Sequence, residues 1–308
     1  MVKKIHLAIV ILHYMNIKDT IECVKSYMDN LDTEFYHIVI VDNASPDCSG
    51  KELEEIFKDN SKITIMLNKK NLGFSAGNNQ GIEYIQNNYE FEYLILSNND
   101  IILYEKHLYE KVSQESKENL FAVMGPMILT ADGRCDSNPI FDLPYTREAA
   151  VAQKRANERR LKLYESRWYP TNIKVNYLWK RFTRRFRKEN SYDSKSRRYN
   201  QPELLLKKRD NIVLHGSFLI FSKKYFERFE GLDVRTFLYA EEDILYQHMK
   251  HWNMRMCYNP DIIVYHKEGK SVAHSNQLNR EKVIFVTKNQ IEAIDAYISL
   301  LDEYEQSL

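Results

Sequence analysis

Four short apolar runs alternate with helix-like segments at the start of the chain, and this alternation restricts the fold more than any other feature. The runs are continuously apolar, which is typical of strands covered on both faces of a sheet. The segments between them carry apolar side chains at helical spacing. Strands are expected at residues 6–12, 37–41, 63–67 and 93–96, and helices at residues 19–28, 51–57 and 76–86. This order predicts an α/β fold with a mostly parallel central sheet and helices on both faces.

The composition is that of a folded chain that does not span a membrane. Of the 308 residues, 44% are hydrophobic and 28% are charged, and no apolar run approaches the roughly 20 residues that cross a bilayer. The first apolar run is followed by His13-Tyr14 and not by a small-residue cleavage site, which favours a strand over a signal peptide. Four scattered cysteines without a Cys-x-x-Cys pair indicate a reducing compartment. We therefore expect a cytoplasmic protein.

The positive charges are concentrated in one segment. Residues 147–209 contain 20 Lys or Arg and 6 Asp or Glu, a net charge of +14, although the whole chain carries only +1. Within this segment Leu178, Phe182 and Phe186 are spaced as one helical strip, with Trp179 beside them and most cations elsewhere. Such a strip predicts a helix that lies on an anionic membrane, here the inner face of the plasma membrane. The alternative is a solvated helical arm.

Polar residues gather where the expected strands end. In sheets of this topology ligands bind beyond the carboxyl ends of the strands. Asp100 comes shortly after the fourth strand, and a carboxylate there can hold Mg²⁺ or Mn²⁺ while substrate phosphates complete the shell. Alternatively, Asp42 and Asp100 simply shape turns. The polar strand-end residues are His13, Tyr14, Asp42, Asn43, Asn71, Asn98, Asn99 and Asp100.

A glycine-rich segment, Asn71-Leu-Gly-Phe-Ser-Ala-Gly-Asn-Asn-Gln-Gly81, leads from the third strand into the third helix. Gly73 permits a backbone conformation that other residues avoid, and the first turn of the helix offers free amides to an anion. The spacing of Gly73, Gly77 and Gly81 also fits a smooth packing face. The segment is neither a dinucleotide fingerprint nor a Walker loop.

Several motifs in sequence order resemble those of the family 2 inverting glycosyltransferases of GT-A fold. They are Val39-Ile-Val-Asp-Asn-Ala-Ser, Asn71-Leu-Gly-Phe-Ser-Ala-Gly-Asn-Asn, Leu96-Ser-Asn-Asn-Asp and Phe237-Leu-Tyr-Ala-Glu-Glu-Asp. The resemblance covers residues 5–130 and 212–268. It is strongest to the bacterial branch that builds surface polysaccharides and includes many rhamnosyltransferases.

The resemblance implies a site for a nucleotide-sugar donor and a divalent metal, Mn²⁺ or Mg²⁺. Asp100 and His266 would hold the metal, and Asp42 would contact the nucleoside. Asn98 stands where the family often has a second Asp, which leaves one carboxylate on the metal. The remaining donor residues would be His13, Tyr14, Asn43, Asn71, Gly73, Phe74, Asn78, Asn98 and Asn99, and the acceptor side would be His215, Gly216 and Ser217.

Three adjacent acids compete for the role of catalytic base. The stretch Phe237-Leu-Tyr-Ala-Glu-Glu-Asp-Ile-Leu resembles the family's F-L-Y-G-E-D-V-D-L, which aligns Glu241 with the family's Glu and Glu242 with its proton acceptor. A shift of one residue would make Asp243 the base. The ungapped alignment favours Glu242. All three acids could instead stabilise the first turn of a helix through its macrodipole.

The resemblance predicts transfer of a sugar from UDP-hexose or dTDP-rhamnose to a hydroxyl of a growing, lipid-linked bacterial surface glycan. The expected partners are this glycan, or a polyprenyl-diphosphate-linked saccharide, and an anionic membrane, but no nucleic acid. Two other classes stay open: a sugar nucleotidyltransferase of similar fold, and a nucleic-acid-binding protein that uses the basic segment. The expected parts are a nucleotide-sugar half at 1–140, a basic helical insertion at 141–210, a catalytic half at 211–270 and a helical tail at 271–308, whose apolar stripe is Ile291, Ile294, Ile298 and Leu301.

Overall fold

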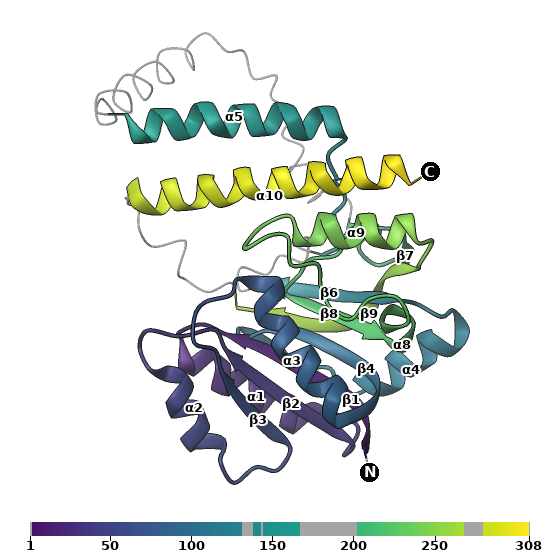
Figure 1. Ribbon diagram of the computed structural model, residues 1–308. Helices are drawn as coiled ribbons and strands as arrows, with labels where there is room; N and C mark the ends of the chain where they lie inside the picture. The colour runs from purple at the N-terminus through teal and green to yellow at the C-terminus, as the bar shows by residue number, and fades with distance from the viewer. Residues whose placement is uncertain (1, 131–137, 143, 167–201, 268–279, 308) are drawn as a thin grey trace. The chain divides into compact units, whose positions relative to one another are not determined.

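The computed structural model describes residues 2–130, 138–142, 144–166, 202–267 and 280–307 (Figure 1). The chain divides into two compact units. Unit 1 comprises Met1–Pro144 and Glu203–Lys270, and unit 2 comprises Tyr145–Pro202 and Ser271–Leu308. The sequence suggested that the basic insertion and the C-terminal tail were separate parts. They belong to one unit, because a helix from each packs against the other.

The first half of unit 1 has the predicted parallel order. Strands β1 (Lys3–His13), β2 (Tyr36–Asp42), β3 (Ile63–Leu67) and β4 (Tyr89–Asn98) are adjacent in the order β3-β2-β1-β4. All three pairings between them are parallel. The connecting helices are α1 (Ile17–Asn30), α2 (Ser49–Phe57) and α3 (Phe74–Asn88). The predicted α/β fold is therefore confirmed, with each element one to four residues longer than its pattern at one or both ends, except β3, which matches it.

The second half of unit 1 extends the same sheet on the far side of β4. Strand β8 (Phe218–Ser222) pairs antiparallel with β4, and β6 (Val123–Thr130), β9 (Met256–His266) and β5 (Ile101–Leu103) follow it in the sheet. The short β7 (Arg209–Asp210) pairs with β9. The helices of this half are α4 (Leu108–Glu118), α8 (Lys223–Phe226) and α9 (Glu241–His251), with a 3₁₀ turn at Pro202–Leu204. Before β8, Val213 forms an isolated bridge with Ile140, and residues 216–217 form a turn.

The sheet separates two hydrophobic cores, which explains why its central strand is apolar on both faces. Leu7, Ile9 and Ile11 of β1 face the core that α1, α2 and α4 cover. Ala8 and Val10 face the other core, which contains side chains from α3, α8 and α9. Because alternate residues of a strand point to opposite faces, a strand between two cores has no polar positions.

Helix α3 packs closely on the sheet through two glycines. A Cβ at Gly77 would lie 2.8 Å from Leu12 Cδ1, and one at Gly81 would lie 2.5 Å from Val10 Cγ1. The interpretation of these glycines as a smooth packing face is therefore correct. Their close approach fixes the position of the preceding loop, which ends at the start of α3.

Unit 2 contains two antiparallel helices, α5 (Arg147–Glu165) and α10 (Arg280–Gln306), which lie side by side (Figure 1). The buried stripe of α10 includes Val283, Ala293, Tyr297 and Leu300. The predicted stripe of Ile291, Ile294, Ile298 and Leu301 is only partly buried. The sequence pattern missed Tyr297, which is buried and donates its hydroxyl proton to the carbonyl of Tyr145 at 2.9 Å. The expected interfacial strip at Leu178, Trp179, Phe182 and Phe186 lies outside the described residues.

Among the described residues, no helix has the length and apolar character that crossing a bilayer requires.

We predict that Gly81→Ala destabilises the protein. The added methyl group would overlap a valine fixed in the central strand, and overpacking of this kind typically costs about 1–3 kcal/mol. Alanine gains about 1 kcal/mol of helix propensity, which offsets part of this cost. The free energy of unfolding from urea titration should fall. Glu83→Ala, at an exposed position of the same helix, is the control. Its free energy of unfolding should not fall. A stabilised Gly81→Ala variant would contradict the packing described for α3.

Candidate active site

The carboxyl ends of three parallel strands meet at one edge of the sheet. In the register of β1, His13 pairs with Asp42 of β2, and Leu12 pairs with Asn98 of β4. His266, the last residue of β9, pairs with Ile101 next to Asp100. The strand-end residues singled out in the sequence therefore lie along one edge, as expected from the parallel order.

Asp100 and His266 form a close pair at this edge. Asp100 Oδ1 lies 3.1 Å from His266 Nε2, and the two side chains are 15% and 11% exposed. The next residue, Lys267, donates its backbone amide to the Asp100 carbonyl at 3.0 Å. Its ammonium group contacts Glu22 and lies 2.7 Å from Asp19 Oδ1 on α1. These contacts hold the end of β9 against the Asp100 loop.

The Asp100–His266 pair fits a divalent metal. Two ligand atoms about 2.1 Å from one ion and at right angles to each other are about 3.0 Å apart. The observed separation of 3.1 Å is close to this value. Within the described part of the chain, the buried Nδ1 of His266 has no hydrogen-bond partner. One carboxylate and one imidazole give a weak site that needs oxygen atoms from a bound phosphate to complete it.

Asn43 links two loops through its side chain. Its Nδ2 donates to Asn71 Oδ1 and to the Gly73 carbonyl, both at 3.0 Å, and its Oδ1 accepts the Leu72 amide at 2.9 Å. Asn43 is 3% exposed. The side chain that the sequence offered as a donor ligand is thus used to brace the glycine-rich loop.

Gly73 is the residue that brings this loop against the segment before α9. Its φ is +81°, and a Cβ would lie 2.2 Å from the Phe237 carbonyl oxygen. The next amide, that of Phe74, donates to the same carbonyl at 3.0 Å. Both the left-handed backbone and the close approach require glycine. The loop at the start of α3 is therefore held against the segment that precedes α9.

Two of the predicted donor residues have almost no exposed surface. His13 is completely buried, and its two ring nitrogens bond to Thr20 Oγ1 at 2.7 Å and Ser49 Oγ at 2.8 Å. Burial lowers its pKa, which keeps the ring neutral. Asn78 is 1% exposed and donates to the Phe74 carbonyl at 3.0 Å. In this conformation both side chains support the loops and cannot contact a nucleotide-sugar donor.

The other donor candidates differ in their access to solvent. Tyr14 is 43% exposed. Asp42 is 6% exposed and accepts the Ser45 amide at 3.2 Å together with the Ser45 hydroxyl. Asn99 is partly buried, and its Nδ2 donates to Thr20 Oγ1 at 3.0 Å. Asp42 therefore shapes its turn, as one interpretation of the sequence predicted. It also lies at the carboxyl edge of the sheet.

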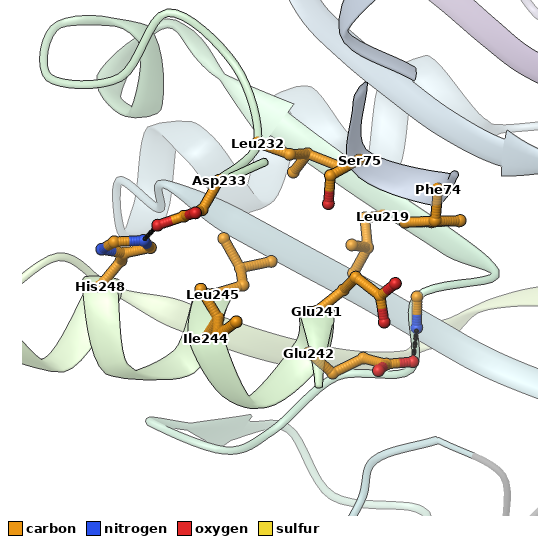
Figure 2. A pocket seen from close by; sticks show the side chains of 11 residues that line it. Phe74, Ser75, Leu219, Leu232, Asp233, Glu241, Glu242, Ile244, Leu245 and His248 are labelled. Carbon is orange, nitrogen blue, oxygen red and sulfur yellow. Dashed lines mark hydrogen bonds and ion pairs between the residues drawn. The ribbon is translucent and has the colours of Figure 1, made fainter. Parts of the chain in front are cut away.

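The turn His215-Gly216-Ser217 contacts both the Asp100–His266 pair and the three acids at the start of α9. The Gly216 amide donates to Glu242 Oε1 at 3.1 Å, the dashed contact at the right of Figure 2. The Asn98 amide donates to the Ser217 carbonyl at 2.8 Å. The rings of His215 and His266 meet edge to face with centroids 5.9 Å apart. One turn thus contacts both halves of the candidate site.

Helix α9 begins at Glu241 after two residues with left-handed backbone. Tyr239 has φ +78° and Ala240 has φ +63°. A side chain in this region costs about 1–2 kcal/mol per residue. Strained backbone of this kind clusters at functional sites, where the surrounding structure maintains it. The family motif that this stretch resembles has glycine in place of Ala240, and glycine adopts such a backbone without this cost.

The three acids at the start of α9 have different environments. Glu242 is hydrogen-bonded to the Gly216 amide. Burial raises the pKa of Glu241 to about 7, and the nearby charge of Glu242 adds to the rise. Burial and the same charge raise the pKa of Asp243 to about 6. Figure 2 shows the cause for Glu241, whose carboxyl group lies in a pocket lined mostly by apolar side chains: Phe74, Leu219, Leu232, Ile244 and Leu245.

Sequence reasoning missed a buried asparagine that holds the central turn. Asn138 is completely buried, its Oδ1 accepts the His215 amide at 2.9 Å, and its Nδ2 donates to the Pro126 carbonyl at 2.6 Å. It lies 77 residues before the turn it supports. A single asparagine at that distance gives no sequence signal.

A second missed group borders the pocket of Figure 2. His248 Nε2 lies 3.0 Å from Asp233 Oδ2, which also accepts the Arg235 Nε proton at 2.8 Å. Burial acts to raise the pKa of Asp233, but the hydrogen bonds from His248 and Arg235 outweigh it and lower the pKa to about 2. The charged Asp233 therefore fixes the loop that precedes α9.

One further group of possible metal ligands lies at the opposite edge of the sheet. Asp32, His107 and Glu110 have ligand atoms within 4.8 Å of one another, and all three are exposed. Asp32 precedes β2, and its carboxylate accepts the amides of Tyr109 at 2.8 Å and Glu110 at 3.0 Å. These bonds satisfy the free amides at the start of α4. The group is explained as a helix cap.

Part of the chain matches a family of known proteins, and its fold is similar to that of solved structures. Residues 8–134 match the model of the family described as Glycosyl transferase family 2. S. aureus TarS 1-349 in complex with UDP is similar at a TM-score of 0.52 and 12% identity, over 92% of this chain and 65% of that chain. GalNAc-T7 with UDP, GalNAc and Mn²⁺ is similar at a TM-score of 0.54 and 13% identity, over 85% of this chain and 44% of that chain.

This chain spans less than two thirds of either structure. At such identities the likeness establishes a shared fold. No curated protein matches the sequence.

We predict that Glu241→Gln changes the pH dependence of stability. A carboxyl group whose pKa is raised on folding stabilises the protein below its unfolded pKa, and this contribution is lost as the pH rises through about 7. The melting temperature of wild type should therefore fall relative to the variant between about pH 5 and about pH 8. The exposed Glu83→Gln is the control and should follow wild type. Parallel pH profiles for wild type and Glu241→Gln would contradict the buried, protonated state of Glu241.

Proposed function

We propose that this protein, which matches the Glycosyl transferase family 2 model over residues 8–134 and shares its fold with TarS and GalNAc-T7, is a GT-A glycosyltransferase that transfers a sugar with inversion from a nucleoside diphosphate sugar to an acceptor hydroxyl. The observation that carries the proposal is the turn at residues 215–217. On one side it contacts the Asp100–His266 pair, and on the other its amide binds Glu242. One short turn thus contacts both the pair proposed for the leaving diphosphate and the carboxylate proposed for the acceptor proton.

The donor would bind along the carboxyl edge of β1, β2 and β4. Tyr14 is exposed at this edge, and the nearly buried Asp42 is the residue that the resemblance assigns to the nucleoside. The glycine-rich loop, braced by Asn43, leads from the same edge into α3. UDP in the TarS and GalNAc-T7 structures supports a uridine nucleotide. UDP-hexose and dTDP-rhamnose are both consistent with these contacts, and membership of the rhamnosyltransferase branch stays a prediction.

Asp100 and His266 would hold Mn²⁺ or Mg²⁺. A bound divalent ion supplies Lewis-acid stabilisation of the charge that develops on the leaving diphosphate. This chain's own residues keep the two ligands in place, since Lys267 fastens the end of β9 to α1. The Asn98 amide, bonded to Ser217, keeps the strand end beside the turn.

Glu242 is the residue we assign as base. The acceptor hydroxyl would give its proton to the Glu242 carboxylate as its oxygen bonds to the anomeric carbon and the bond from that carbon to the diphosphate oxygen breaks. The Gly216 amide binds Oε1 and leaves Oε2 for the proton. Burial raises the pKa of Glu241 to about 7 and that of Asp243 to about 6, whereas Glu242 is the acid that the Gly216 amide holds.

The acceptor would be a hydroxyl of a growing bacterial surface glycan, attached to a polyprenyl diphosphate or another lipid. Such an acceptor lies at a membrane, so the enzyme would work in the cytoplasm at the inner face of the plasma membrane. The net charge of +14 in residues 147–209 supports this location. Neither a sugar nucleotidyltransferase nor a nucleic-acid-binding protein explains why the turn that contacts the Asp100–His266 pair also holds the Glu242 carboxylate. We therefore favour neither class.

We predict that Asp100→Ala lowers transfer by about 100-fold or more, because the metal would lose its only protein carboxylate. Isothermal titration should show that Mn²⁺ no longer strengthens UDP binding. Asp59→Ala, an exposed acid on unit 1, is the control and should leave both unchanged. Full activity of wild type in excess EDTA would exclude the metal role.

A second prediction separates the three acids. Glu242→Gln should lower kcat by about 10²- to 10⁴-fold while donor affinity is retained, since only the proton acceptor is lost. Asp243→Asn and Glu241→Gln should retain most of the activity. An inactive Asp243→Asn beside an active Glu242→Gln would move the base by one residue. NMR of the product should show inverted anomeric configuration, and retention would exclude a single displacement.

A further inference from the structure

The charges of unit 2 are divided between its two helices. The α5 helix contains six Lys or Arg and three Glu, whereas α10 contains three Lys or Arg and six Asp or Glu. The charges that face each other across the pair are neutralised. Arg147 bonds to Asp302 at 2.5 Å, Lys154 to Asp295 at 2.6 Å and Lys288 to Glu165 at 2.9 Å. The helix pair therefore has a basic side and an acidic side.

The outer face of α5 carries exposed cations, and they form no ion pair with another described residue. Arg155, Arg159 and Lys162 are spaced by four and three residues, which places them in one row along the helix. They and Arg160 are exposed. In the described part of the chain none of the four forms an ion pair, and the Arg160 guanidinium lies 5.5 Å from the centre of the Tyr164 ring. Glu148, in the first turn, is the acid on this face.

Exposed apolar surface lies within the row of cations. Leu163 follows Lys162 and is 49% exposed. Ala156 and Ala152, also exposed, lie about two and three turns earlier on the same face. A leucine flanked by arginines and lysines is typical of a helix that lies at a lipid–water interface, where the apolar group enters the acyl boundary and the cations meet the headgroups. Nucleic-acid surfaces use the same cations but add stacking aromatics or polar side chains that contact bases.

We propose that the outer face of α5, formed by Arg155, Arg159, Arg160, Lys162 and Leu163, docks on an anionic phospholipid membrane. The acidic α10 would be repelled by the same surface, so the helix pair would bind with α5 toward the lipid. This inference extends the proposed function by naming the surface that brings the enzyme to a lipid-linked acceptor. It does not depend on the assignment of Asp100 or Glu242.

The test is cosedimentation of the full chain with vesicles of phosphatidylglycerol and phosphatidylcholine, and with vesicles of phosphatidylcholine alone. The variant Arg155→Glu/Arg159→Glu/Lys162→Glu should bind the anionic vesicles at least about tenfold less than wild type. Lys25→Glu/Lys106→Glu/Lys117→Glu makes the same change in net charge at exposed lysines of unit 1 and should bind like wild type. Leu163→Ser should mainly reduce the binding that persists in high salt.

If both triple variants lost binding equally, net charge alone would explain the loss, and the proposal would be overturned. Absence of binding by wild type, or tighter binding to a DNA duplex than to anionic vesicles, would overturn it as well. Circular dichroism shows whether each variant is folded. Donor hydrolysis without vesicles should be unchanged by the α5 variant. Docking without any hydrolysis would instead contradict the transfer function and leave the docking surface intact.

Discussion

The parallel pairing of β1 with both β2 and β4 is the constraint on which the rest of the molecule depends. Because β1 is buried on both faces, neither partner can shift by one residue without turning apolar side chains toward the wrong core. This register places Asp42 and Asn98 on either side of His13. The loops after β2 and β4, which carry Asn43 and Asp100, start from these fixed points, so the rigid apolar core holds their polar side chains in place.

The turn at residues 215–217 links two parts of the candidate site. Its amide is used to hold one carboxylate of α9, while its flanking contacts reach the strand end and the imidazole of His266. Burial separates the acids further, because it raises the pKa of Glu241 and of Asp243. Three adjacent carboxyl groups of the same helix turn therefore differ in environment, and our proposal assigns the base to the one that the turn holds.

The sequence predicted what depends on local pattern and failed where distant segments meet. Continuous apolar runs and helical spacing were enough for the parallel half of the sheet. The antiparallel β8, the support of the turn by Asn138 and the pairing of α5 with α10 all join residues far apart in the chain, and single-sequence periodicity carries no such information. The stripe of α10 was misassigned because Tyr297, a half-polar residue, is buried where isoleucines were expected. His13 was offered as a ligand, but burial and two hydrogen bonds make it a support.

A crystal structure of the full chain with UDP and Mn²⁺ would test the central claim, that one edge of the sheet binds a nucleotide and a metal beside a fixed base. The account predicts the ion about 2.0–2.3 Å from a carboxylate oxygen of Asp100 and from Nε2 of His266, with diphosphate oxygens completing its shell. It also predicts that Glu242 keeps its hydrogen bond to Gly216. A nucleotide bound elsewhere, or a metal held by the diphosphate without either residue, would contradict the account.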